Sequence, residues 1–202
     1  MTNMWEIENS YFENGVKLIC GVDEAGRGPL AGPVCAAAVI LPVNCDIPGL
    51  TDSKKLTDKR RRELVPIIKE KAISYGIAFA TEKEIDEINI LQATFLAMKR
   101  AIAQLEGKAD FALIDGNRAK DFGLPVRTVV KGDSLSASIA AASVLAKVTR
   151  DDIMLEMAEK YPEYGFEVHK GYGTKAHYEA LRNHGHSSIH RMTFLKKFYG
   201  QG

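Results

Sequence analysis

The chain is poor in cysteine, and its few cysteines suggest neither a metal site nor a disulfide framework. Three occur among 202 residues, at Cys20, Cys35 and Cys45, and Cys20 and Cys35 lie in apolar runs. Their spacing matches no zinc-binding pattern. We therefore expect reduced thiols, most of them core residues, as in proteins of a reducing compartment.

Long hydrophobic runs, repeats and low-complexity tracts are also missing. No apolar run approaches the roughly 20 residues that span a bilayer, and residues 1–14 are polar and acidic, unlike a secretory signal. Hydrophobic residues make up 46% and charged residues 26% of the chain, which is ordinary for a globular domain. We expect a cytoplasmic protein with no membrane contact.

The chain also lacks a strong net charge, which is +1. The charges are nevertheless unevenly distributed. Residues 1–50 carry six acids and two bases, whereas residues 160–202 carry three acids, seven bases and all five histidines. A neutral total can combine an acidic site with a basic surface. Charge alone favours the plainer interpretation, a solvated basic face.

The pattern of apolar residues predicts alternating strands and helices. Thr81 and Glu84 form a capping-box signature, which predicts a helix start. From that start a single apolar stripe runs through Ile85, Ile88, Leu91, Phe95 and Met98. The expected strands are 18–22, 34–41, 75–80, 111–114 and 126–130, and the expected helices are 56–72, 81–105, 134–160 and 174–183.

Three strands followed by strand–helix crossovers predict an α/β fold, a mixed sheet flanked by helices. Residues 1–160 would form this domain. Residues 161–202 contain no clear strand and are expected to form a small C-terminal helical appendage.

Four carboxylates lie where predicted strands end. Asp23 and Glu24 follow the first strand, Asp115 follows the fourth, and Asp133 lies shortly after the fifth. Neighbouring strands would bring them to one edge of the sheet, where oxygen ligands suit Mg²⁺. Two such ions about 4 Å apart can activate water and stabilise the leaving oxygen in phosphodiester cleavage. Taken singly, each acid has a plainer explanation: a turn residue, a surface pair or, for Asp133, a helix N-cap.

The loop after the first strand is rich in glycine and carries one arginine, in the segment Gly26-Arg27-Gly28. A loop without side chains can approach a phosphate backbone closely. A dinucleotide-binding interpretation fails, because the glycine spacing differs from the fingerprint and a strand follows in place of a helix.

With these residues identified, the chain resembles bacterial ribonuclease HII, the type 2 ribonuclease H. The resemblance extends from about Ile19 to Phe198, and its motifs occur in the family's order. They are GVDEAGRGPLAGPV from Gly21, DSKKL from Asp52, IDG from Ile114, KGD from Lys131, ASVLAKVTRD from Ala142 and HKGYGT from His169.

The resemblance implies a ribonuclease H-like fold and an endoribonuclease. Such enzymes cleave the RNA strand of RNA/DNA hybrids and cut 5′ to a single ribonucleotide in duplex DNA, leaving a 3′-hydroxyl and a 5′-phosphate. It implies Mg²⁺ or Mn²⁺ as cofactor, and a monomer. It also implies that Asp23, Glu24, Asp115 and Asp133 are the catalytic, metal-binding acids, the same four that the strand ends indicate.

Recognition of the ribose depends on its 2′-hydroxyl. By the resemblance, the backbone of Gly26, Arg27 and Gly28 surrounds that sugar and Tyr172 stacks near it. Without the resemblance, Tyr172 would be taken as a half-buried aromatic residue in a turn.

Several basic and polar residues are candidates for phosphate or other substrate contacts. They are Lys54, Lys55, Ser143, Lys147 and Arg150, the last three at helical spacings that allow one shared face. Each could instead belong to an ordinary solvated surface. The run 60–62, three arginines, is interpreted as a solvated helix face without a role in the site.

The C-terminal part offers two further interpretations. The five histidines form no paired zinc motif, so structural or phosphate-facing roles are expected. Residues 192–199 resemble a sliding-clamp peptide in their aromatic pair but lack its leading glutamine, and we favour packing of this segment on the domain. Rival functions remain: another ribonuclease H-like polynucleotidyl transferase, which would not need the 2′-hydroxyl, and a non-catalytic hybrid-binding protein.

Overall fold

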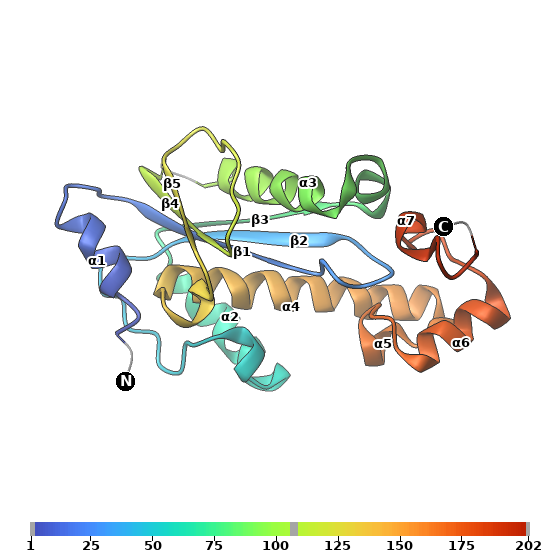
Figure 1. The fold of residues 1–202 in the computed structure, drawn as a ribbon. Coiled ribbons are helices and arrows are strands. Elements are labelled where there is room, and N and C mark those ends of the chain that lie inside the picture. The colour runs from blue at the N-terminus through green and yellow to red at the C-terminus, as the bar shows by residue number, and fades with distance from the viewer. Residues whose placement is uncertain (1–2, 106–108, 201–202) are drawn as a thin grey trace.

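The computed structural model describes residues 3–105 and 109–200, which form one five-stranded sheet between two helical layers (Figure 1). The strands are β1 (Ile19–Ala25), β2 (Val34–Ile40), β3 (Ser74–Ala80), β4 (Phe111–Asp115) and β5 (Val126–Val129). The helices are α1 (Glu6–Phe12), α2 (Asp58–Lys71), α3 (Glu82–Ala103), α4 (Ala137–Lys160), α5 (Phe166–His169), α6 (Lys175–His184) and α7 (Met192–Leu195). Short 3₁₀ turns cover Ser53–Lys55, Gly132–Ser134 and Pro162–Tyr164.

The sheet is mixed, as expected. Its strand order is β3-β2-β1-β4-β5. The first three strands pair antiparallel, and β4 and β5 join β1 in parallel. The predicted α/β fold is therefore confirmed, and the parallel pairing brings the ends of β1 and β4 to one edge.

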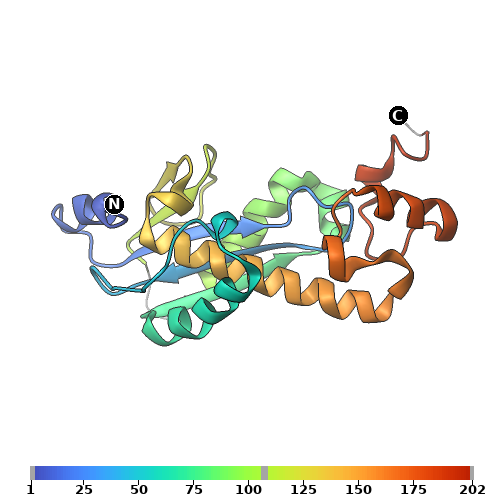
Figure 2. The ribbon, with the colours of Figure 1, turned by 90° about the horizontal axis from the view of Figure 1, so that it is seen from below.

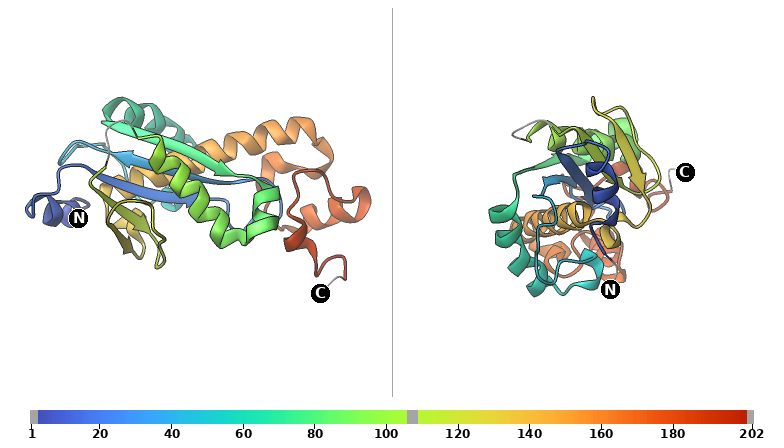
Figure 3. Two further views of the ribbon diagram at one scale, coloured as in Figure 1. Left: turned by 90° about the horizontal axis from the view of Figure 1, so that it is seen from above. Right: turned by 90° about the vertical axis from the view of Figure 1, so that its left-hand side faces the viewer.

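Helices cover both faces of the sheet, so the interior strand β2 is apolar throughout. In β2, Ala36 and Ala38 pack towards α3, whereas Cys35, Ala37 and Val39 pack towards α2 and α4. Figure 2 and Figure 3 show α4 running along one face and extending beyond the sheet to the C-terminal helices.

The long helix α4 approaches the sheet closely because its residues are small. Fifteen of its residues are buried, most of them alanine or other small or aliphatic residues. It lies directly over Gly21 of β1, where an added Cβ would come within 2.1 Å of the Ser138 backbone. This contact places the first turns of α4 over the strand that carries the two adjacent acids.

Some helix boundaries differ from the sequence prediction. Helix α4 begins at Ala137, because Ser136 is its N-cap and residues 132–134 form a 3₁₀ turn, so the N-cap interpretation of Asp133 is wrong. The helix α1 was missed; its buried Glu8 accepts hydrogen bonds from Ser136 and Ser138 at the start of α4.

The helix α3 starts at the predicted capping box, which the hydrogen bonds between Thr81 and Glu84 confirm. The single apolar stripe is wrong, however. Asn89 has φ 67° and kinks the helix, and its side chain accepts N–H groups of the second segment. Ile88, before the kink, is therefore 38% exposed.

Residues 161–200 form three short helices and no strand beyond one isolated bridge, Ala31–His190. They share a hydrophobic cluster with Leu30, Met154 and Ala158 of the main body. Among the described residues, no helix has the length and apolar character needed to cross a bilayer. Cys20 and Cys35 are buried free thiols, as expected, and Cys45 is a partly buried one.

Candidate active site

The four acids gather at one edge of the sheet. Val22 of β1 is paired with Ile114 of β4, so the next residues, Asp23 and Asp115, are neighbours across the parallel pair. The Gly132 N–H donates to Asp115 Oδ1 over 2.7 Å and ties the turn that carries Asp133 to the end of β4. The predicted convergence of strand ends thus has a direct structural basis.

The adjacent acids lie inside β1 and do not follow it. Pairing with β2 extends β1 to Ala25, so Asp23 and Glu24 are its fifth and sixth residues. Successive side chains of a strand point to opposite faces. Asp23 accordingly meets Ser143 of α4, while Glu24 borders the hollow beside α3. Both still reach the cleft described below, because β1 ends there.

Burial and mutual repulsion destabilise the charged forms of the acids in this cluster. Burial raises the pKa of Asp23 well above its ordinary value, and the charges of Glu24 and Asp115 raise it further. Burial also raises the pKa of Glu24, although Arg27, 3.3 Å away, opposes the shift. These directions indicate a site that a cation would stabilise.

Lys54 supplies part of the missing positive charge. Its Nζ lies 3.2 Å from Asp133 Oδ2. Burial raises the pKa of Asp133, and the hydrogen bond and charge of Lys54 oppose that shift. Partial burial lowers the pKa of Lys54, but Asp133 and the other acids raise it above its ordinary value overall.

Ten of the thirteen predicted site residues line a single cleft; the exceptions are Asp133, Lys55 and Arg150. The cleft joins the acids to the glycine loop and to Tyr172, which is 45% exposed. A Cβ added at Gly28 would meet the Tyr172 ring at 3.5 Å. The glycine loop and the tyrosine therefore face each other across the site.

The cleft has a polar inner wall formed by α4 and the turn at 53–55. The hydroxyl groups of Ser53 and Ser143 are 2.6 Å apart, and Ser143 also hydrogen bonds to Asp23. Lys147 lies one turn further along α4 and pairs with Asp151 at 2.8 Å. Lys55 is exposed and lies outside the cleft lining.

The interpretation of Arg61 as a solvated residue is wrong. Its side chain is 12% exposed and lines the cleft, and its Nη1 donates to the carbonyls of Ser53 and Leu56. It thereby holds the turn that presents Lys54. Only the folded turn reveals this role, because an arginine in a basic helix segment has no distinguishing sequence signal.

Arg150 does not offer its charge to a substrate as the sequence suggested. It is 1% exposed and donates to the backbone carbonyls of Ala31, Pro33 and Lys170. Its side chain occupies the space next to Gly26, where a Cβ would approach within 1.9 Å of it. Arg150 is therefore a support beneath the glycine loop.

Arg191, which the sequence analysis did not single out, holds the same loop from the C-terminal side. It is completely buried, and its guanidinium donates to four carbonyls of the loop: those of Gly26, Arg27, Pro29 and Gly32. Burial, followed by the charge of Arg150, lowers the pKa of Arg191 to about 9. Two buried arginines thus fix a loop that glycine alone would leave loose.

The donor set suits a hard divalent cation, because every candidate ligand is a carboxylate oxygen. Within residues 3–105 and 109–200, however, no three side chains of histidine, cysteine, aspartate or glutamate are close enough to form a finished metal-binding group. Asp133 is paired with Lys54, and Asp23 and Glu24 occupy successive positions of β1, whose side chains point to opposite faces.

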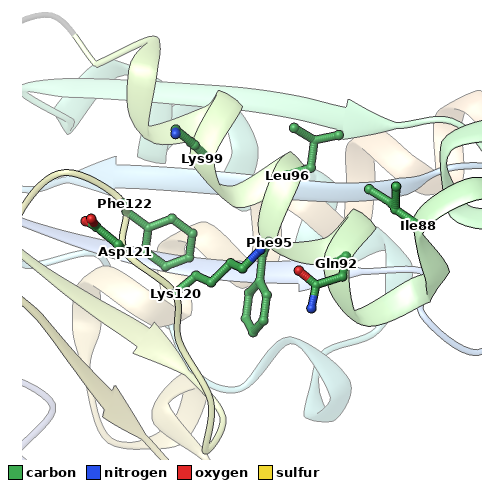
Figure 4. Close-up of a pocket in the computed structure, with 8 residues that line it drawn as sticks. All are labelled: Ile88, Gln92, Phe95, Leu96, Lys99, Lys120, Asp121 and Phe122. Carbon is green, nitrogen blue, oxygen red and sulfur yellow. The ribbon is translucent and has the colours of Figure 1, made fainter.

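A second, apolar pocket lies between α3 and residues 120–122 (Figure 4). Phe95 and Phe122 meet there edge to face, with ring centroids 6.2 Å apart. It contains Asp121 but none of the four converging acids, so we place the chemistry in the cleft at the sheet edge.

The chain matches a family model described as ribonuclease HII over residues 20–197. A ribonuclease HII of Endomicrobium trichonymphae is 55% identical over 195 residues, which are 96% of this chain and 92% of the relative. One of Dechloromonas aromatica (strain RCB) is 58% identical over 179 residues, 89% of this chain and 91% of the relative.

Solved structures of related proteins have the same fold. The ribonuclease H2 from Pyrococcus horikoshii OT3 matches with TM-score 0.75 at 27% identity, over 92% of this chain and 97% of its own. A chain of the PCNA:RNase HII complex from Archaeoglobus fulgidus matches with TM-score 0.68 at 25% identity, over 87% and 93%. Bst-RNase HIII in complex with Mn²⁺ shares the fold, with TM-score 0.63 at 19% identity over 85% and 64%.

Proposed function

The chain belongs to the ribonuclease HII family and is a ribonuclease H endonuclease, and we propose that it reads one ribose at the cleft and cuts on its 5′ side. The products would carry 3′-hydroxyl and 5′-phosphate ends. The observation that carries this proposal is the single cleft that combines the acids with the glycine loop and Tyr172. Both the RNA strand of a hybrid and a lone ribonucleotide in duplex DNA present that ribose.

The enzyme depends on a divalent metal ion, and Asp23, Glu24, Asp115 and Asp133 are the residues that would hold it. The all-oxygen donor set and the raised pKa values of the buried acids support this assignment. Mg²⁺ and Mn²⁺ both fit such donors. When bound, the metal supplies an activated water and stabilises the leaving oxygen.

The protein side chains orient these acids and the scissile phosphate. The hydroxyl of Ser143 fixes the carboxylate of Asp23, and the Gly132 N–H fixes that of Asp115. Lys54 and Lys147 carry positive charge into the cleft, where a phosphate would lie. Lys55 extends this charge outside it.

Ribose selection is assigned to the glycine loop and Tyr172, which line the same cleft as Asp23, Glu24 and Asp115. The backbone of Gly26, Arg27 and Gly28 would surround the sugar and contact the 2′-hydroxyl, which deoxyribose lacks. Tyr172 would stack on that sugar from the far side. The two buried arginines support this role, because they hold the loop by its carbonyls.

Residues 161–202 are proposed to act as an appendage that completes the site on the 1–160 domain. Tyr172 belongs to this appendage, and the hydrophobic residues of the appendage pack against Leu30 and Met154. For the 192–199 segment we favour packing over binding of a sliding clamp, because Leu195 is buried and Phe198 packs on Tyr178. The enzyme is proposed to act as a monomer.

Cleavage of a labelled DNA duplex that carries one ribonucleotide tests this function. With Mg²⁺ or Mn²⁺ we expect one cut 5′ to the ribonucleotide and none in an all-DNA duplex. Asp115→Asn should lower the rate by about a thousandfold, since it removes several kcal/mol of metal-dependent stabilisation. The same variant should still bind the duplex.

The exposed Asp46→Asn is the matched control, because it removes the same charge away from the cleft. Full activity of Asp115→Asn would contradict the site assignment. Cleavage of all-DNA junctions would indicate another polynucleotidyl transferase. Metal-independent binding without any cleavage would indicate a hybrid-binding protein.

A further inference from the structure

Three histidines of the C-terminal part form a buried cluster that the proposed chemistry does not use. His169, His177 and His190 are all buried. The rings of His169 and His177 stack with centroids 4.6 Å apart, and Nε2 of His177 lies 3.0 Å from Nε2 of His190. Tyr164 and Phe166 close the cluster with aromatic contacts.

The hydrogen bonds fix where the protons lie in the pair His177–His190. The backbone N–H of Ser187 donates to His190 Nδ1 over 2.9 Å, so that nitrogen carries no proton. At the other end, His177 Nδ1 lies 2.9 Å from the carbonyl oxygen of Tyr172, which only accepts, so this nitrogen carries a proton. The shared contact is then satisfied in one way, with His190 Nε2–H donating to His177 Nε2.

This arrangement requires both rings to be neutral. A proton added to His177 Nε2 would place two N–H groups opposite each other across 3.0 Å. A proton added to His190 Nδ1 would face the N–H of Ser187 across 2.9 Å. The surroundings agree, since burial lowers the pKa of His190 to about 4 and also lowers that of His177. The other titratable groups that face the pair are His169, His186 and Tyr164. None of them is a carboxylate, whose negative charge would stabilise an imidazolium.

The pair connects the two walls of the ribose site. One end holds the carbonyl of Tyr172, the residue whose ring faces Gly28. The other end is anchored to the glycine loop, since His190 forms the bridge with Ala31 and the next residue, Arg191, holds four carbonyls of that loop. A shift of His190 would therefore change the spacing between loop and tyrosine.

We propose that the His190–His177 pair is a positioning relay, which sets the place of Tyr172 relative to the 26–28 loop and thereby the selectivity for a single ribonucleotide. Neither histidine lines the cleft, so each acts through Tyr172. The inference rests on the ribose-reading role given above to Tyr172. Misplacement of a positioning group by about 1 Å can cost about a hundredfold in rate.

Two pairs of substitutions in the full chain separate positioning from simple folding. Gln at 190 can place an N–H near the position of Nε2, whereas Leu cannot. Asn at 177 can still donate to the Tyr172 carbonyl, whereas Leu cannot. We expect His190→Leu and His177→Leu to lower kcat/KM on a single-ribonucleotide duplex by about tenfold or more. On a long RNA/DNA hybrid the loss should be several times smaller, because every nucleotide of the RNA strand presents a 2′-hydroxyl and the strand can bind in many registers.

His190→Gln and His177→Asn should recover most of this loss, and the exposed His184→Gln should behave as wild type. Equal losses on both substrates, or no recovery by the polar variants, would overturn the relay. Tyr172→Ala in the same assays shows separately whether the ribose-reading role holds. If Tyr172→Ala loses no selectivity, the proposed function of that residue is wrong, whatever the histidines do.

Nitrogen-15 NMR of the wild-type histidine rings tests the proton positions without any variant. We expect an unprotonated Nδ1 on His190, a protonated Nδ1 on His177 and no imidazolium at neutral pH. A protonated Nδ1 on His190, or a charged ring in either residue, would overturn the proposal even if the leucine variants failed to fold.

Discussion

The charged form of Asp23 is destabilised by its burial and by the neighbouring acids. Asp23 is 4% exposed and lies beside Glu24 and Asp115, and its pKa is raised well above the ordinary value. Hydrogen bonds from Ser143 and the Glu24 N–H favour its charged form, as does the charge of Lys54. Charge repulsion of this kind is tolerated at functional sites at the expense of stability.

We therefore predict that Asp23→Asn stabilises the metal-free protein while abolishing cleavage. A carboxyl whose folded pKa is raised contributes stability at pH values below its unfolded pKa and loses that contribution as pH rises through the folded pKa. The gain in Tm should thus be greatest near neutral pH and vanish below about pH 4. Thermal unfolding in EDTA measures it, at roughly 2–4 °C for each kcal/mol.

Asp46→Asn serves as the exposed control for this comparison and should leave Tm unchanged. Added Mn²⁺ should raise the Tm of the wild type but not that of Asp23→Asn, since ligand binding to the native state stabilises it. A lower Tm of Asp23→Asn at pH 7 in EDTA would show that the carboxylate stabilises the fold.

Two glycines of one segment have opposite roles at the level of elements. Gly21 lies beneath α4, where a Cβ would come within 2.2 Å of the backbone of Ser138 and Ile139. Gly28 lies in the cleft, where a Cβ would meet the Tyr172 ring at an ordinary 3.5 Å. The first glycine permits helix packing, and the second leaves room for a ligand.

Gly21→Ala and Gly28→Ala form a matched pair for this distinction. We expect Gly21→Ala to destabilise the protein by about 2–3 kcal/mol, because α4 must move off β1. Gly28→Ala should change the free energy of unfolding by less than about 1 kcal/mol but lower kcat/KM by about tenfold. Denaturant unfolding and cleavage assays check both; a loss of stability in Gly28→Ala without a loss of activity would contradict the assignment.

The C-terminal helices depend on histidines that are neutral in the fold. His190 has a folded pKa of about 4, below its ordinary value of 6.5. Its contribution to stability is therefore complete above pH 6.5 and lost as pH falls towards 4. The buried His169 and His177 are held by the same packing.

We predict that α5 and α6 open before α4 as the pH falls from 6.5 to 4. Hydrogen exchange, corrected for the intrinsic effect of pH, should show faster opening in residues 161–191 while α4 up to Val148 stays protected. His190→Gln should reduce this pH dependence, because glutamine does not titrate. Simultaneous opening of both regions would show that the C-terminal helices and α4 form one cooperative unit.

At the scale of the whole molecule, a net charge of +1 conceals a local field suited to nucleic acid. Four acids lie at the sheet edge, and Arg27, Lys54 and Lys147 border the same cleft. The basic residues would face phosphates, and a metal ion would offset the acids. Overall charge therefore says little about the substrate.

The number of phosphate contacts predicts a measurable salt dependence. With about three or four basic contacts, the slope of log binding constant against log salt should be roughly −3, and each lysine lost should reduce it by about one. Binding of the Asp115→Asn variant to a ribonucleotide-containing duplex measures this slope. Lys147→Met should make the slope less steep, whereas the exposed Lys59→Met should leave it unchanged. Equal slopes for the two variants would show that Lys147 does not contact a phosphate.

Sequence alone was sufficient wherever a local pattern determines structure. The apolar runs predicted all five strands, and the capping box predicted the start of α3. The ends of β1 and β4 predicted that Asp23 and Asp115 converge, since parallel pairing brings such ends together. Family motifs quoted from the sequence agreed with the family match over residues 20–197.

Only the tertiary structure decided what buried polar side chains do. Arg150 looks like a phosphate-binding residue in the sequence and Arg191 has no distinguishing signal there, but both are buried and hold loop carbonyls. The partners of Arg61 and of His190 depend on chain segments that local patterns do not relate. An arginine or histidine has the same side chain in either role, and the difference lies in which carbonyls the fold brings within hydrogen-bond distance.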